Sequence, residues 1–193
     1  MMENRTDKDY FIVGDSGAGY VFPDLFREDN PTRKAISGLP DGMEIFKKWN
    51  IRYYNQFGLD TTGFLLSHDV RINGQNIINP ITREVMDMFA AFSAGGINAS
   101  RLPEGENVIP KGQFNAQYKT KDGLIPVTLH NGDVYGGSHR AAQFGEQILE
   151  RLHTAGDEDV CLCFRSIIVS PHDIQCIQDY VTSHDDRVVF TDM

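Results

Sequence analysis

Short apolar runs alternate along the chain with longer segments of helical periodicity. The apolar runs predict six strands, at residues 10–13, 62–66, 95–99, 124–129, 160–169 and 188–190. The segments between them predict helices that begin near Asp41, Pro80, Ser138 and Ser170. Because strands and helices alternate, the pattern predicts an α/β domain with mainly parallel strands.

Two of the intervening segments allow more specific predictions. In the helix after Asp41, large apolar side chains recur at helical spacing, at Met43, Phe46, Trp49, Tyr53 and Phe57, and Gly58 follows as a stop. This spacing predicts a buried core face rather than an exposed platform for sugar rings. Residues 101–123 carry no such pattern and predict a long irregular loop.

The first predicted strand breaks into a glycine-rich turn. Gly14, Gly17 and Gly19 let the backbone turn sharply and approach a ligand closely. The spacing does not match a phosphate-binding loop, because no Gly-Lys-Ser/Thr follows. The polar side chains on this turn are Asp15, Ser16 and Tyr20. A strand end with such a turn is where α/β proteins place functional sites.

Residues 17–23, Gly-Ala-Gly-Tyr-Val-Phe-Pro, resemble the signature of the GxGYxYP family, with Phe22 where Tyr is usual. Asp9-Tyr10-Phe11 and the tail around Phe164-Arg165 are also similar to the family. Its members are described as putative glycoside hydrolases of β/α-barrel type. The resemblance implies that residues 1–193 form a single α/β domain, the C-terminal part of a partial or irregular β/α barrel. An open barrel leaves unpaired strand edges, so we expect that the chain could self-associate.

The acids that follow the predicted strands are the candidate catalytic groups. Glycoside hydrolysis usually uses two carboxylates, and Asp15, Asp69 and Asp133 each follow a strand at one expected rim. The same acids are also typical of turns, where Asp bonds to its own backbone. Asn98, Arg101, Glu104 and Glu106 are further polar groups near this rim. The predicted substrate-binding residues are Ser16, Gly17, Gly19, Tyr20, His130 and Arg165.

Metal and cofactor sites are not predicted. The pairs His68-Asp69 and His130 with Asp133 could suggest a metal, but neighbouring residues of a strand point to opposite faces. The net charge of −9 argues against partners that are nucleic acids or anionic membranes. No apolar run is long enough for a membrane span. Residues 1–8 are polar and lack a secretory core, which predicts a cytoplasmic protein if the chain is complete and an exported one if it derives from a longer parent.

These observations predict a carbohydrate-active, glycoside-hydrolase-like protein that binds or hydrolyses a glycan or oligosaccharide at the strand-end rim. Two alternatives stay open. The chain could be a non-catalytic, truncated module that binds a glycan or a protein. It could also be an SGNH-like esterase that uses Ser16, because Gly14-Asp15-Ser16 is similar to the nucleophile block of those enzymes.

Overall fold

A computed structural model describes most of the chain. The described residues are 6, 12–14, 17, 19, 21–27, 29–30, 41–72, 74–79, 81–103, 105–112, 114–156 and 160–190, and side chains are described for these except at 68–72 and 76–79. Three predicted site residues, Asp15, Ser16 and Tyr20, therefore lie outside the described residues, as does the side chain of Asp69. The first predicted strand is described only at Ile12 and Val13.

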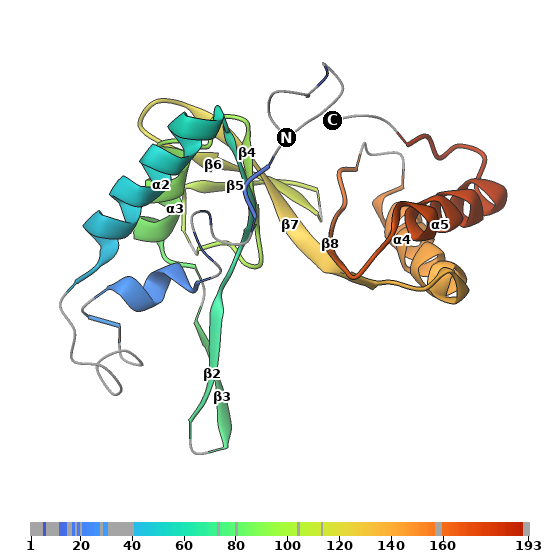
Figure 1. The fold of residues 1–193 in the computed structure, drawn as a ribbon, viewed down its shortest axis with the longest axis horizontal. Coiled ribbons are helices and arrows are strands. Elements are labelled where there is room, and N and C mark those ends of the chain that lie inside the picture. The colour runs from blue at the N-terminus through green and yellow to red at the C-terminus, as the bar shows by residue number, and fades with distance from the viewer. Residues whose placement is uncertain are drawn as a thin grey trace. The chain divides into compact units, whose positions relative to one another are not determined.

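The chain divides into two compact units. Unit 1 comprises Met1–Lys111 and Asn115–His130, and unit 2 comprises Gly112–Phe114 and Asn131–Met193. That residues 1–193 form one domain stays a prediction. Figure 1 shows the helices and strands of both units.

The sheet of unit 1 is mixed rather than mainly parallel. Its strands run in the order β1-β4-β7-β6-β5, with bounds β1 Thr61–Leu65, β4 Gly96–Ala99, β5 Val108–Lys111, β6 Asn115–Lys119 and β7 Leu124–Tyr135. β4 pairs with β1 and β7 in parallel, whereas β6 pairs with β5 and β7 antiparallel. Val13 adds a parallel bridge to Thr62. Among the described strands the sheet is not closed, so the α/β class is confirmed and the barrel is not.

Two hairpins lie in segments where we predicted no strands. β5 and β6 occupy part of residues 101–123, so the prediction of an irregular loop there is wrong. Ala116 and Tyr118 of β6 point into the core, and this short alternation was too weak to recognise. After β1, β2 (His68–Ile72) and β3 (Gln75–Asn79) form a separate two-stranded sheet. Asp69 therefore lies in a hairpin strand rather than in a turn at a sheet edge.

Helices α2 (Met43–Phe57) and α3 (Arg83–Ala90) pack on the core side of this sheet, and the 3-10 turn η2 (Pro23–Phe26) precedes them. Gly58 adopts the left-handed conformation with φ 62°, which confirms it as the end of α2. α3 begins after Thr82 rather than at Pro80, and the Thr82 hydroxyl caps it by accepting from the amide of Val85.

The buried face of α2 differs from the predicted one. Met43 and Phe46 are buried as predicted, but the next buried positions are Asn50 and Tyr54. Trp49 is 58% exposed and Tyr53 is 37% exposed, so their assignment to the core is wrong. The reason is geometric: positions 43, 46, 50 and 54 follow the helical period more closely than 43, 46, 49 and 53, and only one stripe can face the sheet.

Unit 2 has a smaller core, built from two helices and the strands β7 and β8. η3 (Ser138–Arg140) leads into α4 (Ala141–Ala155), then come β8 (Cys163–Ile167), which pairs with β7, and α5 (Pro171–His184). Ser170 begins α5 as predicted, and the structure adds a complete capping box between Ser170 and Asp173. β8 is shorter than the predicted strand at 160–169. Residues 188–190 are not a strand, and Phe190 is 44% exposed.

Candidate functional site

The parallel strands of unit 1 place four side chains on one face near their carboxyl ends. Phe64, Asn98 and Thr128 are neighbours in register on β1, β4 and β7. Registered neighbours point to the same face of a sheet, and His130 lies two residues after Thr128, so it shares that face. The rings of Phe64 and His130 are 4.3 Å apart between centroids. We call Phe64, Asn98, Thr128 and His130 the strand-end face.

Asn98 is the buried polar group of the strand-end face. Its exposed fraction is 8%, and its Nδ2 donates to the carbonyl oxygen of Thr128 at 2.9 Å. No described residue hydrogen bonds to its Oδ1, which is also buried. Leaving a buried acceptor unsatisfied costs about 1–3 kcal/mol. This oxygen is therefore suited to accept from a hydroxyl or amide of a bound molecule.

Asp133 and Arg165, which we predicted to be catalytic and substrate-binding, contact each other in unit 2. β7 continues to Tyr135 instead of ending at residue 129, so Asp133 lies inside a strand and not in a strand-end turn. Arg165 on β8 donates from Nε to Oδ1 at 3.0 Å and from Nη2 to Oδ2 at 2.9 Å. Such a bidentate pair fixes the orientation of both side chains. The prediction of a turn at Asp133 is thus wrong, while its catalytic role stays a prediction.

Gly17 of the signature packs closely against two helices. Its φ is +78°, and a Cβ at this position would collide with the Asn50 amide of α2 and contact Phe89 of α3. Gly19 has no such restriction, because the nearest atom to its Cβ position is Cγ1 of Val21 at 3.7 Å. Packing alone therefore requires a glycine at position 17. The predicted contact of both glycines with substrate stays a prediction.

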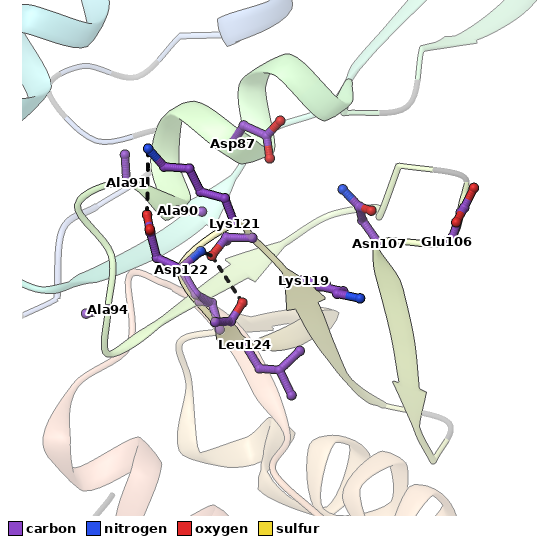
Figure 2. Close-up of a pocket in the computed structure, with 13 residues that line it drawn as sticks. Asp87, Ala90, Ala91, Ala94, Glu106, Asn107, Lys119, Lys121, Asp122 and Leu124 are labelled. Carbon is purple, nitrogen blue, oxygen red and sulfur yellow. Dashed lines mark hydrogen bonds and ion pairs between the residues drawn. The ribbon is translucent and has the colours of Figure 1, made fainter.

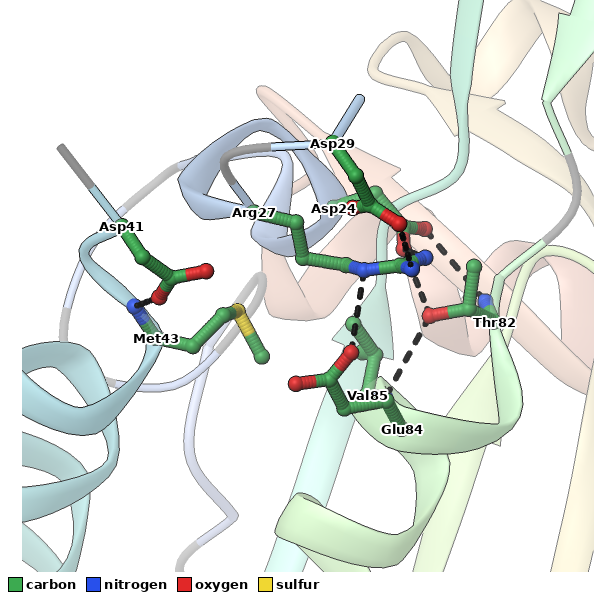
Figure 3. Close-up of polar contacts among 8 residues, drawn as sticks. All are labelled: Asp24, Arg27, Asp29, Asp41, Met43, Thr82, Glu84 and Val85. Carbon is green, nitrogen blue, oxygen red and sulfur yellow. Dashed lines mark hydrogen bonds and ion pairs between the residues drawn. The ribbon is translucent and has the colours of Figure 1, made fainter. Parts of the chain in front are cut away.

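A buried carboxylate directly after the signature was not among the predicted site residues. Asp24 is 3% exposed, and its Oδ1 accepts from the Thr82 hydroxyl at 2.6 Å (Figure 3). Burial raises the pKa of Asp24, and the hydrogen bonds from Thr82 oppose that rise. Arg27 lies 3.8 Å from Asp24 and pairs more closely with Glu84, at 2.9 Å. Asp24 thus ties the signature segment to the start of α3. An Asp after Pro23 in a first turn was the available signal.

A hollow of about 710 Å³ lies at the opposite ends of the parallel strands (Figure 2). It is bordered by Leu124 and Ile125 at the start of β7 and by Ala94 shortly before β4. Its charged lining residues are Asp87, Glu106, Lys119, Lys121 and Asp122. Glu106 lines this hollow, whereas the predicted catalytic and substrate-binding residues whose side chains the structure describes do not.

Metal ligation finds no support in the described side chains, since no group of three His, Cys, Asp or Glu could hold an ion. Cys161, Cys163 and Cys176 are thiols rather than disulfides, and burial raises the pKa of the Cys163 thiol to about 11. A thiol with so high a pKa is protonated near neutral pH and is a poor nucleophile. The described helices include none that is long and apolar enough to cross a membrane.

Comparison with known families supports the signature. The profile of the GxGYxYP putative glycoside hydrolase C-terminal domain matches residues 1–103, which is more than half of the chain. The chain belongs to this family. No curated protein and no solved structure matches it significantly. The matched region holds the signature, Asp69, Phe64 and Asn98, whereas His130, Asp133 and Arg165 lie beyond it.

Proposed function

We propose that the chain is a carbohydrate-active protein whose unit 1 binds a glycan at the strand-end face. The observation that carries this proposal is the buried Oδ1 of Asn98, which has no described donor, next in register to the ring of Phe64. A sugar offers hydroxyl donors for this oxygen and an apolar C–H face for an aromatic ring. The His130 ring, which contacts Phe64, adds a second ring to this face, and this ring is polar.

The description of the GxGYxYP family as putative glycoside hydrolases supports the choice of a sugar over other hydroxylated ligands. The carboxyl ends of parallel strands are also where α/β proteins bind ligands. We propose that the sheet of unit 1 belongs to a barrel-like domain whose rim contains the strand-end face. The hollow near Asp87 lies at the other ends of these strands, and none of its described lining residues is aromatic.

Hydrolysis is the catalytic form of this proposal. It assigns Asp15, Asp69 and Asp133 as the carboxylates, with Ser16, Gly17, Gly19, Tyr20 and Arg165 contacting the substrate beside His130. In retaining and inverting enzymes alike, one carboxyl group acts as an acid and another as a base or nucleophile. The bidentate contact from Arg165 holds Asp133 in a fixed orientation, as either role requires.

A glycan-binding module without turnover is the second candidate. It is favoured by the engagement of both Asp133 oxygens with Arg165, because a carboxylate used in this way has fewer lone pairs for substrate. The esterase alternative depends on Ser16, and labelling by a serine-directed fluorophosphonate tests it directly. Labelling that disappears in Ser16→Ala would support an esterase.

The binding proposal is tested by thermal unfolding of the full chain against cello-, xylo-, chito- and galacto-oligosaccharides. A ligand that binds the folded state raises the unfolding midpoint. We expect one series to do so, and Asn98→Ala to weaken that binding by about tenfold or more, equivalent to about 1.4 kcal/mol. Asn107→Ala, at the border of the hollow near Asp87, is the matched control and should bind normally.

Two results would count against this site. Either no oligosaccharide shifts the midpoint, or Asn107→Ala loses binding while Asn98→Ala retains it. Release of reducing sugar from the same oligosaccharides separates the two candidates. Turnover that Asp133→Asn abolishes indicates hydrolysis, and binding without turnover indicates a module.

A further inference from the structure

The outer side of α2 carries an exposed apolar and aromatic stripe. Ile45, Trp49 and Tyr53 are 63%, 58% and 37% exposed. They are four residues apart, so they follow one another along one side of the helix about 6 Å apart. Lys48, Arg52 and Gln56 are exposed as well and lie between and beyond them. We call Ile45, Lys48, Trp49, Arg52, Tyr53 and Gln56 the α2 stripe.

Packing among the described residues of unit 1 does not account for the α2 stripe. The helix anchors itself through Met43, Phe46, Asn50 and Tyr54, which lie on its other side. A soluble protein seldom exposes a run of large apolar side chains unless that surface binds something. The guanidinium of Arg52 lies 5.5 Å from the centroid of the Trp49 ring, and the Trp49 side chain nevertheless stays largely exposed. The ring is thus both oriented and accessible.

The charge of the α2 stripe is opposite to that of the chain. Its two charged residues, Lys48 and Arg52, are both cationic, whereas the whole chain has a net charge of −9. A cationic strip with aromatic rings is complementary to an anionic polymer whose units have an apolar face. A carboxylate or sulfate on such a polymer can accept two donors from one Arg.

We propose that the α2 stripe binds an anionic polysaccharide, a linear chain of uronic acid or sulfated sugar units. Successive sugar rings contact Trp49 and Tyr53, and their acidic groups pair with Arg52 and Lys48. This inference takes the class of its ligand from the proposed function, but its surface shares no residue with the strand-end face. The α2 stripe is a second, external site that holds a polymer on the protein.

Affinity electrophoresis of the full chain in native gels tests this proposal, with polygalacturonate as the anionic polymer and dextran as the neutral one. We expect retardation by polygalacturonate only. Trp49→Ala should weaken it about tenfold and Arg52→Gln about threefold, and Trp49→Phe should restore most of it. Ile174→Ala, an exposed apolar position on α5 that is 39% exposed, is the matched control and should behave as the wild type. The variants lie at exposed helix positions, and circular dichroism confirms that each is folded.

Several results would overturn the proposal. Equal retardation by dextran would show that binding does not depend on the charge of the polymer. Normal retardation of Trp49→Ala would show that the Trp49 ring does not contact it. Equal retardation by single-stranded DNA indicates a general polyanion surface. A concentration-dependent dimer that Trp49→Ala dissociates, measured by light scattering, indicates that a second copy covers the stripe. Asn98→Ala distinguishes the two sites: it should leave polygalacturonate retardation unchanged even where it removes oligosaccharide binding.

Discussion

Unit 1 and unit 2 both use tyrosine and aspartate hydrogen bonds, but they place them in different surroundings. In unit 1 the Tyr54 hydroxyl lies 2.6 Å from that of Thr62, which in turn bonds to Ser93 in the interior. In unit 2 the Tyr180 hydroxyl donates to Glu146 at 2.8 Å at the surface. These tyrosine hydrogen bonds thus lie in the interior of unit 1 and at the surface of unit 2.

The pKa values of aspartates are shifted in opposite directions in the two units. Burial raises the pKa of Asp24 in unit 1. Hydrogen bonds from Arg187 lower the pKa of Asp185 in unit 2, and those from Ser170 lower the pKa of Asp173. The tyrosine pKa values are raised in both units, but for different reasons. Burial raises the pKa of Tyr54 to about 12, whereas the hydrogen bond to Glu146 is the chief cause of the raised pKa of Tyr180. Acid should therefore affect the two units in opposite ways.

The largest expected effect comes from shortening a buried side chain in the core of each unit. Phe89→Ala empties a fully buried position of unit 1 and should lower the free energy of unfolding by about 3–5 kcal/mol. Leu149→Ala, 9% exposed in the smaller core of unit 2, should fall at the low end of about 2–5 kcal/mol because that site can relax. Urea unfolding followed by circular dichroism measures both. Equal losses would mean that the two cores are packed equally well.

The signature glycine provides the next largest effect. Gly17→Ala should lower the free energy of unfolding by at least about 1–2 kcal/mol, the strain of a left-handed alanine, because its Cβ also meets Asn50. Fluorescence of Trp49, the only tryptophan, follows the unfolding of unit 1. Gly19→Ala is the control and should stay within about 0.5 kcal/mol of the wild type. A stable Gly17→Ala that no longer binds oligosaccharide would assign Gly17 to the ligand instead of to packing.

A smaller effect is expected at the cap of α5. Ser170→Ala removes the acceptor for the amide of Asp173 and should cost unit 2 about 1 kcal/mol. Hydrogen exchange of the α5 amides, measured by mass spectrometry, detects the loss locally. Ser183→Ala, near the other end of the helix, should stay within about 0.5 kcal/mol. Similar protection in both variants would show that the capping box does not stabilise α5.

The dependence on pH should differ in sign between the units. The pKa of Asp24 is raised on folding, so its contribution is complete below the ordinary value of about 3.9 and is lost as the pH rises through the raised pKa. The pKa of Asp185 is lowered, so its contribution is present above that value and is lost as the pH falls through the lowered pKa.

Urea midpoints between pH 3 and 6 test this difference. Asp24→Asn should flatten the pH dependence of the urea midpoint that Trp49 fluorescence reports for unit 1. Asp185→Asn should flatten the pH dependence of hydrogen exchange in α4 and α5. If Asp24→Asn instead makes unit 1 less sensitive to acid, the pKa of Asp24 is lowered on folding, and Thr82 holds it as a carboxylate more strongly than burial opposes it.

The sequence by itself determined features whose physical cause lies within a few residues. The signature at residues 17–23 identified the family, and the profile match over residues 1–103 confirms it. The helix start at Ser170 and the stop at Gly58 were predicted correctly. A cap satisfies amides of its own first turn, and a left-handed residue ends its own helix, so neither depends on a distant partner.

The tertiary structure decided everything that depends on a distant partner. β7 extends past residue 129 through Asp133, and β8 pairs with β7, so the bond between Asp133 and Arg165 follows from strand pairing. The hairpin β5–β6 likewise exists because β6 pairs with β7. Which side of α2 faces the sheet determined that Tyr54 is buried and Trp49 exposed. Pairing and burial join residues tens of positions apart, and local periodicity contains no information about which ones meet.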